Sequence, residues 1–519
     1  MPRFARLVLF VTSVVLAASL LCTAGPGAAQ TRRGGILRHA HISEPPTLDL
    51  HWTTAAVPQD IGVHIYEGLF ALNAAYEPRP LLLESWKLSA NRLVYTFRLR
   101  QGVLFHHGRE LVADDVVTSL ARWGRLAARG RELFRDTVSL TATDRYSVEL
   151  RLREPNALVP LILSWPTQGA VIYPKEVIDE AGTGMVRRFI GTGPYRFVEH
   201  IPDRHIRLDR FDQYKPVDEA PSGMAGRREA YLDTIFFLPI PDPAVRVAGT
   251  IRGEYQFADT IPPDEYDRLR ATRGIATNVI PVANWHGFVF NHREGLMKDK
   301  RLRHAFLAAL DTEALMRGVY GPRQFWRTGP SLMPKEHPMW TDAGREFYNQ
   351  RNPEKARQLL AGAGYQGQPV RWLVAGDLAP HIDSATIAKS QLERAGFVID
   401  LQTSDLATVV SRRARPELWD VFTTRFTFVP DPVLLTFLQP GWPGWYENRE
   451  VTGLLSLLRR HVDPKVRREL WQRAQRMLYE DAATVRLGDY FLLHVLRDEV
   501  KGYTGVPGTF YWNVWLERR

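Results

Sequence analysis

The sequence has almost no cysteine: Cys22 is the only one in 519 residues. It stands in an N-terminal segment that we expect to be removed after Ala29, which would leave the mature chain without a thiol. Such a chain cannot form disulfides, use a thiol nucleophile or hold a metal through thiolates. Its stability therefore has to come from packing.

Long apolar runs are also missing after the first residues. Arg3 and Arg6 precede an apolar stretch, residues 7–21, and small residues follow in TAGPGAAQ. This order is typical of a secretory signal peptide, here residues 1–29, and predicts a mature protein outside the cytoplasm. The alternative, an uncleaved anchor, is disfavoured because the apolar stretch is short for a membrane span. The residue before Cys22 is not the small residue of a lipobox, so we expect no lipid anchor.

Basic runs are absent too, although the formal net charge is +10, and +8 without Arg3 and Arg6. Arginines alternate with acidic residues, as in RLDRFDQY and EYDRLRATR, which is typical of solvated faces. A nucleic-acid-binding protein would concentrate positive charge on one element. We therefore expect no nucleic-acid partner.

Signatures of catalysis and of cofactor binding are missing. Neither GxSxG nor HExxH occurs, and the pair His39 and His41 has no i, i+4 spacing and no third ligand nearby in the sequence. GAGYQG, residues 362–367, fits the dinucleotide pattern, but a helix precedes it and a strand follows, so we interpret it as a helix end. We expect no metal, no cofactor and no enzymatic activity. Ligands that converge from distant positions are the open alternative for a metal.

Strand and helix patterns alternate along the rest of the chain, and its length favours two or three lobes. Up to Pro243 strands predominate, and beyond it helices and strands alternate, which predicts an α/β lobe with a largely parallel sheet. The predicted strands include residues 93–100, 146–152, 195–200, 205–211, 233–240, 369–376 and 397–404. The predicted helices include residues 113–128, with Val116, Leu120 and Trp123 on one side, and residues 299–321, 353–364 and 382–396.

The stretch FHHGRELVADDVV, residues 105–117, joins two histidines to two carboxylates and invites a catalytic interpretation. Asp114 and Asp115 stand in the first turn of a predicted helix, where the dipole and the unpaired amides favour carboxylates by ~0.3–1 kcal/mol. His106 and His107 lie in the turn before it. A turn and a charged helix start account for all four residues, and we prefer this interpretation to a catalytic centre.

The same stretch resembles the signature segment of the family 5 extracellular solute-binding proteins, the receptors of ABC importers for peptides, dipeptides and nickel. That segment runs from a Tyr-Thr-Phe strand through a Phe-His-Asp-Gly turn into a Thr-Ala-x-Asp-Val helix start. Here His107 replaces the Asp, and Val112 replaces the N-capping Thr, which loses a cap of about 1 kcal/mol. GGILRHAHISEPPTLDLH, GTGPYRFVEH and KRLRHAFLAALDTEAL resemble other family segments, so the likeness spans essentially the whole mature chain.

The resemblance implies an α/β, two-lobed periplasmic-binding-protein fold of type II, with three domains because lobe one carries an extra domain. Lobe one would take residues 30–75, 190–265 and 487–519. The extra domain would take residues 76–189, and lobe two residues 266–486. Two crossings between the lobes would form a hinge, and a ligand bound between them would favour the closed state.

The cleft between the lobes is the implied ligand site, apolar with a few fixed polar groups. By resemblance, its lining comes from the loop after EPPTLDLH, from three segments of lobe two and from the return of the chain to lobe one. The candidate residues are Trp52, Thr53, Thr54, Trp285, His286, Arg425, Phe426, Phe428, Trp442, Trp445, Asp489 and Tyr490.

One mismatch bears on the ligand. Peptide-binding members of the family place an acidic residue a few positions before an [Asp/Glu]-Pro pair, where it holds the peptide ammonium group. Asp431 and Pro432 match the pair, but Phe428 and Val429 stand upstream, so a buried ammonium would have no partner. Arg425 either meets a carboxylate or other anion of the ligand, or it forms a salt bridge between the lobes or simply lies at the surface.

Together these observations predict a monomeric periplasmic substrate-binding protein that delivers a peptide-like or other small organic solute to an ABC permease complex. A secreted hydrolase is one alternative, with a nucleophile and a base that converge only in the fold. The other is a non-transport role on the same scaffold, as a chemoreceptor partner or a chaperone.

Overall fold

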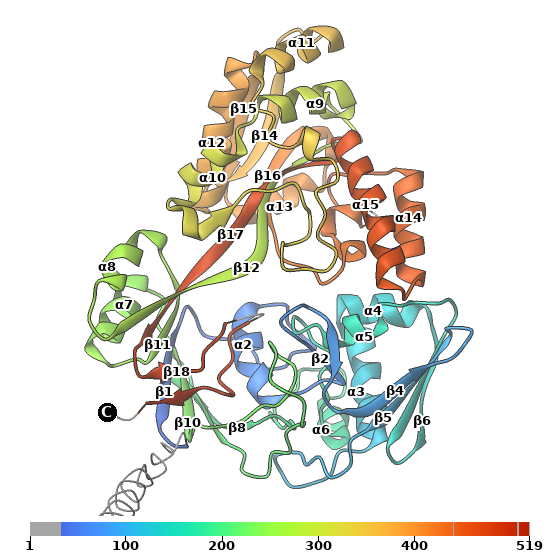
Figure 1. Ribbon diagram of the computed structural model, residues 1–519, viewed down its shortest axis with the longest axis vertical. Helices are drawn as coiled ribbons and strands as arrows, with labels where there is room; N and C mark the ends of the chain where they lie inside the picture. The colour runs from blue at the N-terminus through green and yellow to red at the C-terminus, as the bar shows by residue number, and fades with distance from the viewer. Residues whose placement is uncertain (1–32, 440, 506–507, 518–519) are drawn as a thin grey trace, which may run out of the picture.

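The computed structural model describes residues 33–439, 441–505 and 508–517. The predicted signal peptide, residues 1–29, lies outside them. The described chain forms two lobes, and two long strands, β12 (Ile275–Phe290) and β17 (Thr484–Arg497), run from one lobe into the other (Figure 1). The two-lobed α/β fold expected from the sequence is confirmed.

One mixed sheet passes through both lobes in the order β15-β14-β16-β12-β17-β11-β1-β10-β9-β8, with β13 (Trp326–Arg327) paired to β17. The strands β12 and β17 pair antiparallel from Ile275 opposite Arg497 to Val289 opposite Thr484. Their register shifts between Ile280 and Asn284, which marks an irregularity in the strand pair. Because these two strands carry the chain between the lobes, they form the hinge.

Lobe one is built around β1 (Ile36–His41), which pairs parallel with β10 (Thr234–Pro239) and with β11 (Phe257–Ile261). Apolar side chains of β1, α2 and β10, such as Leu37, Ile61 and Ile235, are fully buried in one cluster. The other elements of this lobe are α2 (Ala56–Ile65), β8 (Tyr195–Ile201), β9 (His205–Arg210), α7 (Pro243–Arg252), α8 (Tyr266–Arg270), β18 (Val500–Lys501) and β19 (Trp515–Leu516).

A second, antiparallel sheet forms the extra domain, with strands in the order β4-β5-β7-β6. The predicted apolar stripe of α3, Val116, Leu120 and Trp123, is buried in the core of this domain. Its strands are β4 (Leu83–Leu88), β5 (Val94–Leu99), β6 (Thr137–Asp144) and β7 (Ser147–Leu152), and its helices are α3 (Ala113–Leu126), α4 (Ala128–Arg135), α5 (Val159–Ser164) and α6 (Lys175–Ala181). We propose residues 76–189 as its limits, because all these elements fall between them. The hairpin of β2 (Phe70–Leu72) and β3 (Pro78–Pro80) leads into the domain.

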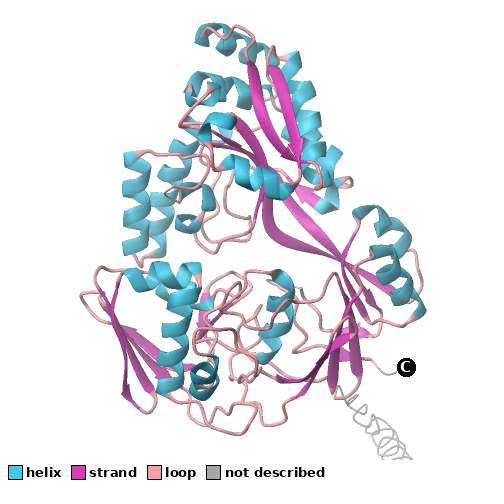
Figure 2. Ribbon diagram, turned by 180° about the vertical axis from the view of Figure 1, so that it is seen from behind, coloured by secondary structure: helices cyan, strands magenta, loops and turns pink. Residues whose placement is uncertain are grey.

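Lobe two contains a parallel set of strands, β15 (Val398–Ser404), β14 (Pro369–Ala375) and β16 (Val421–Phe426), and β16 pairs antiparallel with β12. The sheet of this lobe is thus mixed rather than largely parallel, because the hinge strands enter it in the opposite sense. Helices lie on both faces of this sheet (Figure 2). They are α9 (Lys300–Ala309), α10 (Thr312–Tyr320), α11 (Pro353–Ala363), α12 (Ala379–Arg394), α13 (Leu406–Arg413), α14 (Arg449–Arg460) and α15 (Pro464–Glu480).

Two helix ends follow from local chemistry. The predicted helical region that ends at Gly321 is split into α9 and α10, because the Asp311 side chain accepts hydrogen bonds from the Glu313 and Ala314 amides and starts a new helix. Gly364 has φ +74° and closes α11, so the GAGYQG stretch is a helix end as predicted.

The FHHGRELVADD stretch is structural, as we interpreted it. Asp115, in the first turn of α3, accepts hydrogen bonds from the Val112 and Lys175 amides and from the Arg109 guanidinium. Its bond to Val112 compensates in part for the missing capping hydroxyl. His107 contacts the Glu176 carboxylate at 2.9 Å, and the His106 ring hydrogen-bonds to the Gly193 carbonyl. His106, His107 and Asp115 thus tie the turn and the start of α3 to residues 175–193.

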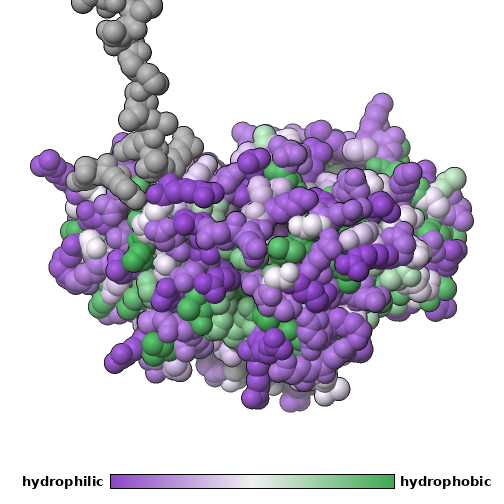
Figure 3. Space-filling view, turned by 90° about the horizontal axis from the view of Figure 1, so that it is seen from below, coloured by the Kyte–Doolittle hydropathy of each residue, from purple (hydrophilic) through white to green (hydrophobic). Residues whose placement is uncertain are grey.

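None of the described helices is long and apolar enough to cross a bilayer. The face at the foot of lobe one is mostly hydrophilic, with apolar residues in small separate groups (Figure 3). That face therefore shows no broad apolar patch.

Candidate functional site

The lobes meet through aromatic rings at Phe428, just after β16. The Phe428 ring lies 4.4 Å from the Tyr76 ring and 5.4 Å from the Trp165 ring, measured between centroids. Tyr76 follows β2, and Trp165 follows α5, so both approach from lobe one. His337 of lobe two completes the group, with its ring 5.9 Å from Phe428. We call Tyr76, Trp165, His337 and Phe428 the interlobe aromatic cluster.

The backbone holds two members of this cluster in place. Tyr76 has φ +61° in the turn between β2 and β3, a conformation that costs a bulky residue on the order of 1–3 kcal/mol. Its amide donates to the Asn73 carbonyl at 3.0 Å. The Phe428 amide donates to the Asn284 side-chain oxygen on β12 at 2.9 Å, which ties the segment after β16 to a hinge strand. Strain retained at Tyr76 is typical of a position under functional constraint.

Charged groups lie beside the aromatic cluster. Arg327 binds the Glu336 carboxylate through both terminal nitrogens, at 2.5 and 2.7 Å, and donates to Asp489 at 2.6 Å. Asp489 also accepts from Arg486, whose guanidinium lies over the Trp285 ring at 5.5 Å. Both carboxylates are thus shared with arginines, and only Glu336, 46 % exposed, remains accessible. We call Arg327, Glu336, Asp489 and Arg486 the charged cluster.

The pKa shifts agree with this arrangement. Burial raises the pKa of Tyr76 to about 12, and the nearby Glu336 charge adds to the effect. Burial also acts to raise the pKa of Glu336, but the Arg327 guanidinium outweighs it and lowers that pKa below its ordinary value. Burial lowers the pKa of His337 to about 4. At neutral pH the interlobe aromatic cluster therefore presents neutral Tyr76 and His337 rings beside the ion pair of Arg327 and Glu336.

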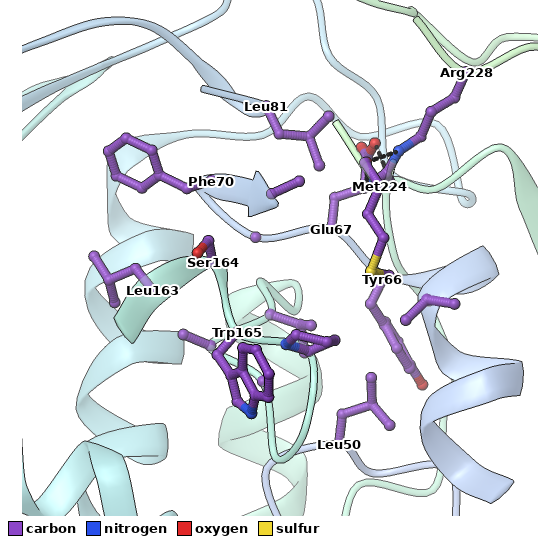
Figure 4. Close-up of a pocket in the computed structure, with 17 residues that line it drawn as sticks. Leu50, Tyr66, Glu67, Phe70, Leu81, Leu163, Ser164, Trp165, Met224 and Arg228 are labelled. Carbon is purple, nitrogen blue, oxygen red and sulfur yellow. Dashed lines mark hydrogen bonds and ion pairs between the residues drawn. The ribbon is translucent and has the colours of Figure 1, made fainter. Parts of the chain in front are cut away.

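A pocket in lobe one opens next to Trp165 (Figure 4). Its volume is about 40 Å³, and one water needs roughly 10–15 Å³ by the same measure, so the pocket has room only for a small group. Glu67 and Arg228 lie at the end away from Trp165 and bind each other at 3.3 Å. The apolar side chains that line it include Leu50, Phe70, Leu81, Leu163 and Met224.

The predicted loop residues Trp52, Thr53 and Thr54 border the same region. The Gln168 amide donates to the His51 carbonyl at 3.2 Å, which places the loop beside the segment that follows Trp165. Trp52 is 43 % exposed, and the Thr53 hydroxyl accepts a hydrogen bond from the Ala55 amide. The loop thus offers an exposed indole beside a residue that is hydrogen-bonded to the segment after Trp165.

In lobe two, the sequence candidates divide between the two faces of the sheet. Trp285 stacks on Phe426 with ring centroids 4.0 Å apart, and Trp442 lies 5.8 Å from Phe426 on the same side. These rings belong to the large apolar cluster that also contains Trp165, so they support the interlobe side.

The other face carries His286, Arg425 and Tyr490. His286 is fully buried and hydrogen-bonds to the Tyr320 and Ser384 hydroxyls. Tyr490 stacks on Tyr320 at 5.1 Å, and the exposed Arg425 lies over the Tyr490 ring at 5.6 Å. His286 therefore lies away from the interlobe aromatic cluster, whereas Tyr490 and the Phe428 amide both bind the Asn284 side chain.

Two further positions have partners within lobe two. Trp445 stacks on Trp419 with ring centroids 5.7 Å apart, and the Arg293 guanidinium lies over the Trp445 ring, 4.7 Å from its centroid. Asp431, at the [Asp/Glu]-Pro position, is buried, binds Arg467 and accepts from the Val433 amide at 3.0 Å. Its carboxylate is thus occupied within the protein.

Sequence reasoning missed five residues here: Tyr76, Trp165, His337, Arg327 and Glu336. The turn AAYEP and the Trp-Pro step after α5 were the available signals, since an aromatic residue in a turn has little local reason to be there. Arg327 and Glu336 gave no signal, because their proximity to Asp489 arises from the pairing of β13 with β17.

A second contact between the lobes lies at the lower end of α14, which meets α4 (Figure 1). Arg459 binds Glu132 at 2.8 Å, and the Ala157 amide donates to the Arg459 carbonyl at 2.7 Å. Arg460 binds Glu154 at 2.8 Å. We call these contacts the α14 latch, because they join lobe two to the extra domain.

Comparison with known proteins agrees with this geometry. Residues 77–444 match the bacterial extracellular solute-binding proteins, family 5. The chain belongs to this family. A relative from Sinorhizobium fredii, a probable peptide ABC transporter periplasmic-binding protein, is 26 % identical over 479 residues, which cover 89 % of this chain and 90 % of the relative.

Solved structures share the fold. The ABC transporter substrate-binding protein CtaP from Listeria monocytogenes superposes with a TM-score of 0.82 at 20 % identity, covering 94 % of this chain and all of the other. The periplasmic binding protein DppA from Helicobacter pylori, solved with the peptide STSA, gives 0.76 at 21 % identity, with 94 % and 99 % covered. The resemblance found in the sequence is thus confirmed for the family and for the type II fold.

Proposed function

We propose that this chain is the periplasmic substrate-binding protein of an ABC importer and captures a peptide-like or other small organic solute between its lobes. The observation that carries the proposal is the interlobe aromatic cluster, where Phe428 of lobe two meets Tyr76 and Trp165 of lobe one. Separation of the lobes along β12 and β17 would open this contact, and closure on a solute would replace ring-to-ring contacts by ring-to-solute contacts. The relatives' description as peptide-binding components of ABC transporters supports the same role.

The residues that we propose to contact the solute are those around this cluster. Trp52 and the Thr53-Thr54 backbone would act from lobe one, and Phe428 and Asp489 from lobe two. Trp285, Phe426 and Trp442 would support Phe428 from behind. We propose no direct contact for His286, which is fully buried, or for Trp445, which stacks on Trp419. The exposed Arg425 and the Tyr490 ring beneath it remain proposed contacts.

The chemistry of the site favours solutes that do not depend on a free α-ammonium group. Asp431 is committed to Arg467, and Asp489 to Arg327 and Arg486. To bind an ammonium group, either carboxylate would have to give up a buried arginine, which leaves a buried charge unpaired. Glu336 is accessible, but Arg327 already holds both of its oxygens.

Binding is tested by tryptophan fluorescence and calorimetry with solutes that co-purify and are identified by mass spectrometry. Phe428→Ala is expected to weaken binding at least tenfold, about 1.4 kcal/mol, because it removes the central ring. Val398→Ala, an exposed apolar position of lobe two, is the matched control and should bind like the wild type. If the folded protein binds none of the peptides and organic anions tested, the receptor role is refuted. If Phe428→Ala binds as tightly as the wild type, the solute site does not lie at the interlobe aromatic cluster.

The ligand class is tested with one peptide in free and N-acetylated forms. We expect acetylation to change the dissociation constant by less than about threefold, since every carboxylate of the site is already bound to an arginine. A loss of affinity of about 100-fold, or 2.7 kcal/mol, would contradict this.

Stimulation of the permease's ATPase by loaded protein would distinguish import from a sensing role. Light scattering of the mature protein should give a monomer.

A further inference from the structure

Three potential metal ligands converge inside lobe one, away from the proposed solute site. His39 and His41 are two residues apart on β1, so their side chains leave the same face of the sheet. The neighbouring strand β11 pairs parallel with β1, with Phe257 opposite His39 and Ala258 opposite Ala40. Asp259 is the next residue on β11, and it therefore lies beside His41. All three side chains are buried.

The distances between their ligand atoms fit a shared cation. Asp259 Oδ2 is 3.5 Å from His39 Nε2 and 3.5 Å from His41 Nδ1, and all three lie within 4.8 Å of one another. These separations are long for hydrogen bonds. Two atoms that bind one tetrahedral Zn²⁺ at ~2.0–2.1 Å are separated by roughly 3.3 Å, close to the two separations from Asp259.

Several polar atoms at this place have no hydrogen-bond partner. Among the described residues these include His39 Nε2 and Asp259 Oδ1, and both residues are at most 4 % exposed. His41 Nε2 also has no hydrogen-bond partner, but it faces Asp60 rather than this point. Buried polar atoms nearly always have a partner in folded proteins. Two unpartnered atoms on neighbouring residues therefore indicate a missing occupant.

The surrounding groups orient the rings as the neighbours of metal ligands do. The Tyr511 hydroxyl lies 3.0 Å from His39 Nδ1 and turns Nε2 towards Asp259. His41 Nε2 faces the Asp60 carboxylate at 3.4 Å, which leaves Nδ1 on the side of Asp259. Histidine ligands usually place their second nitrogen against such a partner. The Ile42 amide also points to His41 Nδ1 at 2.9 Å and would have to give up this contact.

The geometry points to a Zn²⁺ site in lobe one, formed by His39 Nε2, His41 Nδ1 and an Asp259 carboxylate oxygen, with a water as fourth ligand. Two imidazole nitrogens and one carboxylate suit a first-row divalent cation, whereas Mg²⁺ and Ca²⁺ prefer oxygen ligands alone. Burial lowers the pKa of His39 to about 4, so that its ring is neutral and keeps a free lone pair at neutral pH.

The competing occupant is a proton on His41, shared between Asp60 and Asp259. Arg246 and His494 face the same group, and the Arg246 guanidinium donates to the Asp259 carbonyl at 3.3 Å, so positive charge is already close. An ion would replace the proton, and its affinity should rise with pH. The test has to distinguish these two occupants.

A bound ion would tie the first strand of lobe one to the hinge. Asp259 lies on β11, and β11 pairs with the hinge strand β17, with Ala258 opposite Val495. None of the three ligands is among the residues proposed to contact the solute. The ion would therefore act on the stability of lobe one rather than on the captured molecule.

The experiment measures zinc bound to the full mature protein expressed with Zn²⁺ and passed through gel filtration. We expect one Zn²⁺ per chain by mass spectrometry of the metal, a higher unfolding temperature than after chelation, and, with Co²⁺ as a probe, the visible absorption of tetrahedral coordination. His39→Gln and Asp259→Asn should each lower the affinity at least tenfold.

The control is His64→Gln. His64 is a buried lobe-one histidine whose two nitrogens already bind the backbone of Ile61 and Tyr511, so this variant should retain one Zn²⁺ per chain. If folded wild-type protein retains no zinc, or if both ligand variants retain as much as the wild type, the site does not exist and the proton on His41 is the occupant. The wild-type Co²⁺ spectrum decides the question even if the variants fail to fold.

Discussion

A buried ion pair between Asp49 and Arg122 joins the loop that carries Trp52 to helix α3 of the extra domain. The guanidinium donates to both carboxylate oxygens, at 3.0 and 2.5 Å, and both side chains are at most 1 % exposed. Asp49 also accepts from the amides of Val186 and His51. We predict that Arg122→Met, which removes the cation but keeps much of the volume, strongly destabilises this part of the molecule.

The magnitude follows from the charge that the substitution leaves behind. Removal of one partner of a buried pair costs about 3–5 kcal/mol, and the remaining amide donors at Asp49 place this case near 3 kcal/mol. Total stabilities are about 5–15 kcal/mol, so the loss is a large share. The double variant Asp49→Asn/Arg122→Met should cost far less than the sum of the single changes, because it leaves no unpaired charge.

The dependence on pH gives a second measure of the same pair. Burial alone would raise the pKa of Asp49, but Arg122 and other neighbours outweigh it and lower the pKa below its ordinary value. The wild-type contribution is therefore present above the unfolded-state pKa and is lost as the pH falls through the folded-state value. In Arg122→Met the folded-state pKa should rise instead, so the destabilisation should shrink between pH 7 and pH 4.

Urea unfolding followed by circular dichroism measures these effects at pH 7 and pH 4, with the midpoint and the slope compared for all variants. Val245→Ala, an exposed change in lobe one, is a suitable control for handling and baseline. A cost below about 1 kcal/mol for Arg122→Met, or additivity of the two single changes, would show that water or relaxation replaces the arginine and would refute the reasoning.

Two further predictions concern the contacts between the lobes. Glu132→Gln should weaken the α14 latch, since it removes the charge that Arg459 binds at 2.8 Å, and a half-buried pair of this kind contributes about 0.5–1 kcal/mol. X-ray scattering of the ligand-free protein should therefore show a larger mean radius of gyration. An unchanged scattering profile would mean that the latch does not hold the lobes together. Tyr76→Gly should lower solute affinity, because it removes the ring that packs against Phe428. Stability should fall less than for a typical buried tyrosine, because glycine accepts φ +61° without strain. Calorimetry and thermal unfolding measure the two effects, and undiminished affinity would contradict the assigned contact.

Much of the fold could be predicted from the sequence, because the patterns involved are local. The period of Val116, Leu120 and Trp123 predicted the buried face of α3, and Gly364 predicted a helix end. The family likeness, spread over the whole mature chain, predicted two lobes and an extra domain. The split between α9 and α10 was missed because Asp311 was not recognised as a helix cap.

The candidate site could be predicted only in part. Phe428 lies between the lobes as expected, but Trp285 and His286, although adjacent in sequence, point to opposite faces of β12. Adjacent residues of a strand always separate in this way, and a likeness in sequence does not say which face meets the other lobe. The contacts of Tyr76 and Trp165 with Phe428 depend on how three distant segments pack.

The sequence by itself determined most of the elements and the family, since both depend on residue types and short spacings. The tertiary structure alone decided which side chains meet. It committed Asp431 to Arg467 and brought Asp259 of β11 beside His39 and His41 of β1. Strand pairing joins residues that are far apart along the chain, and no local pattern records such pairs.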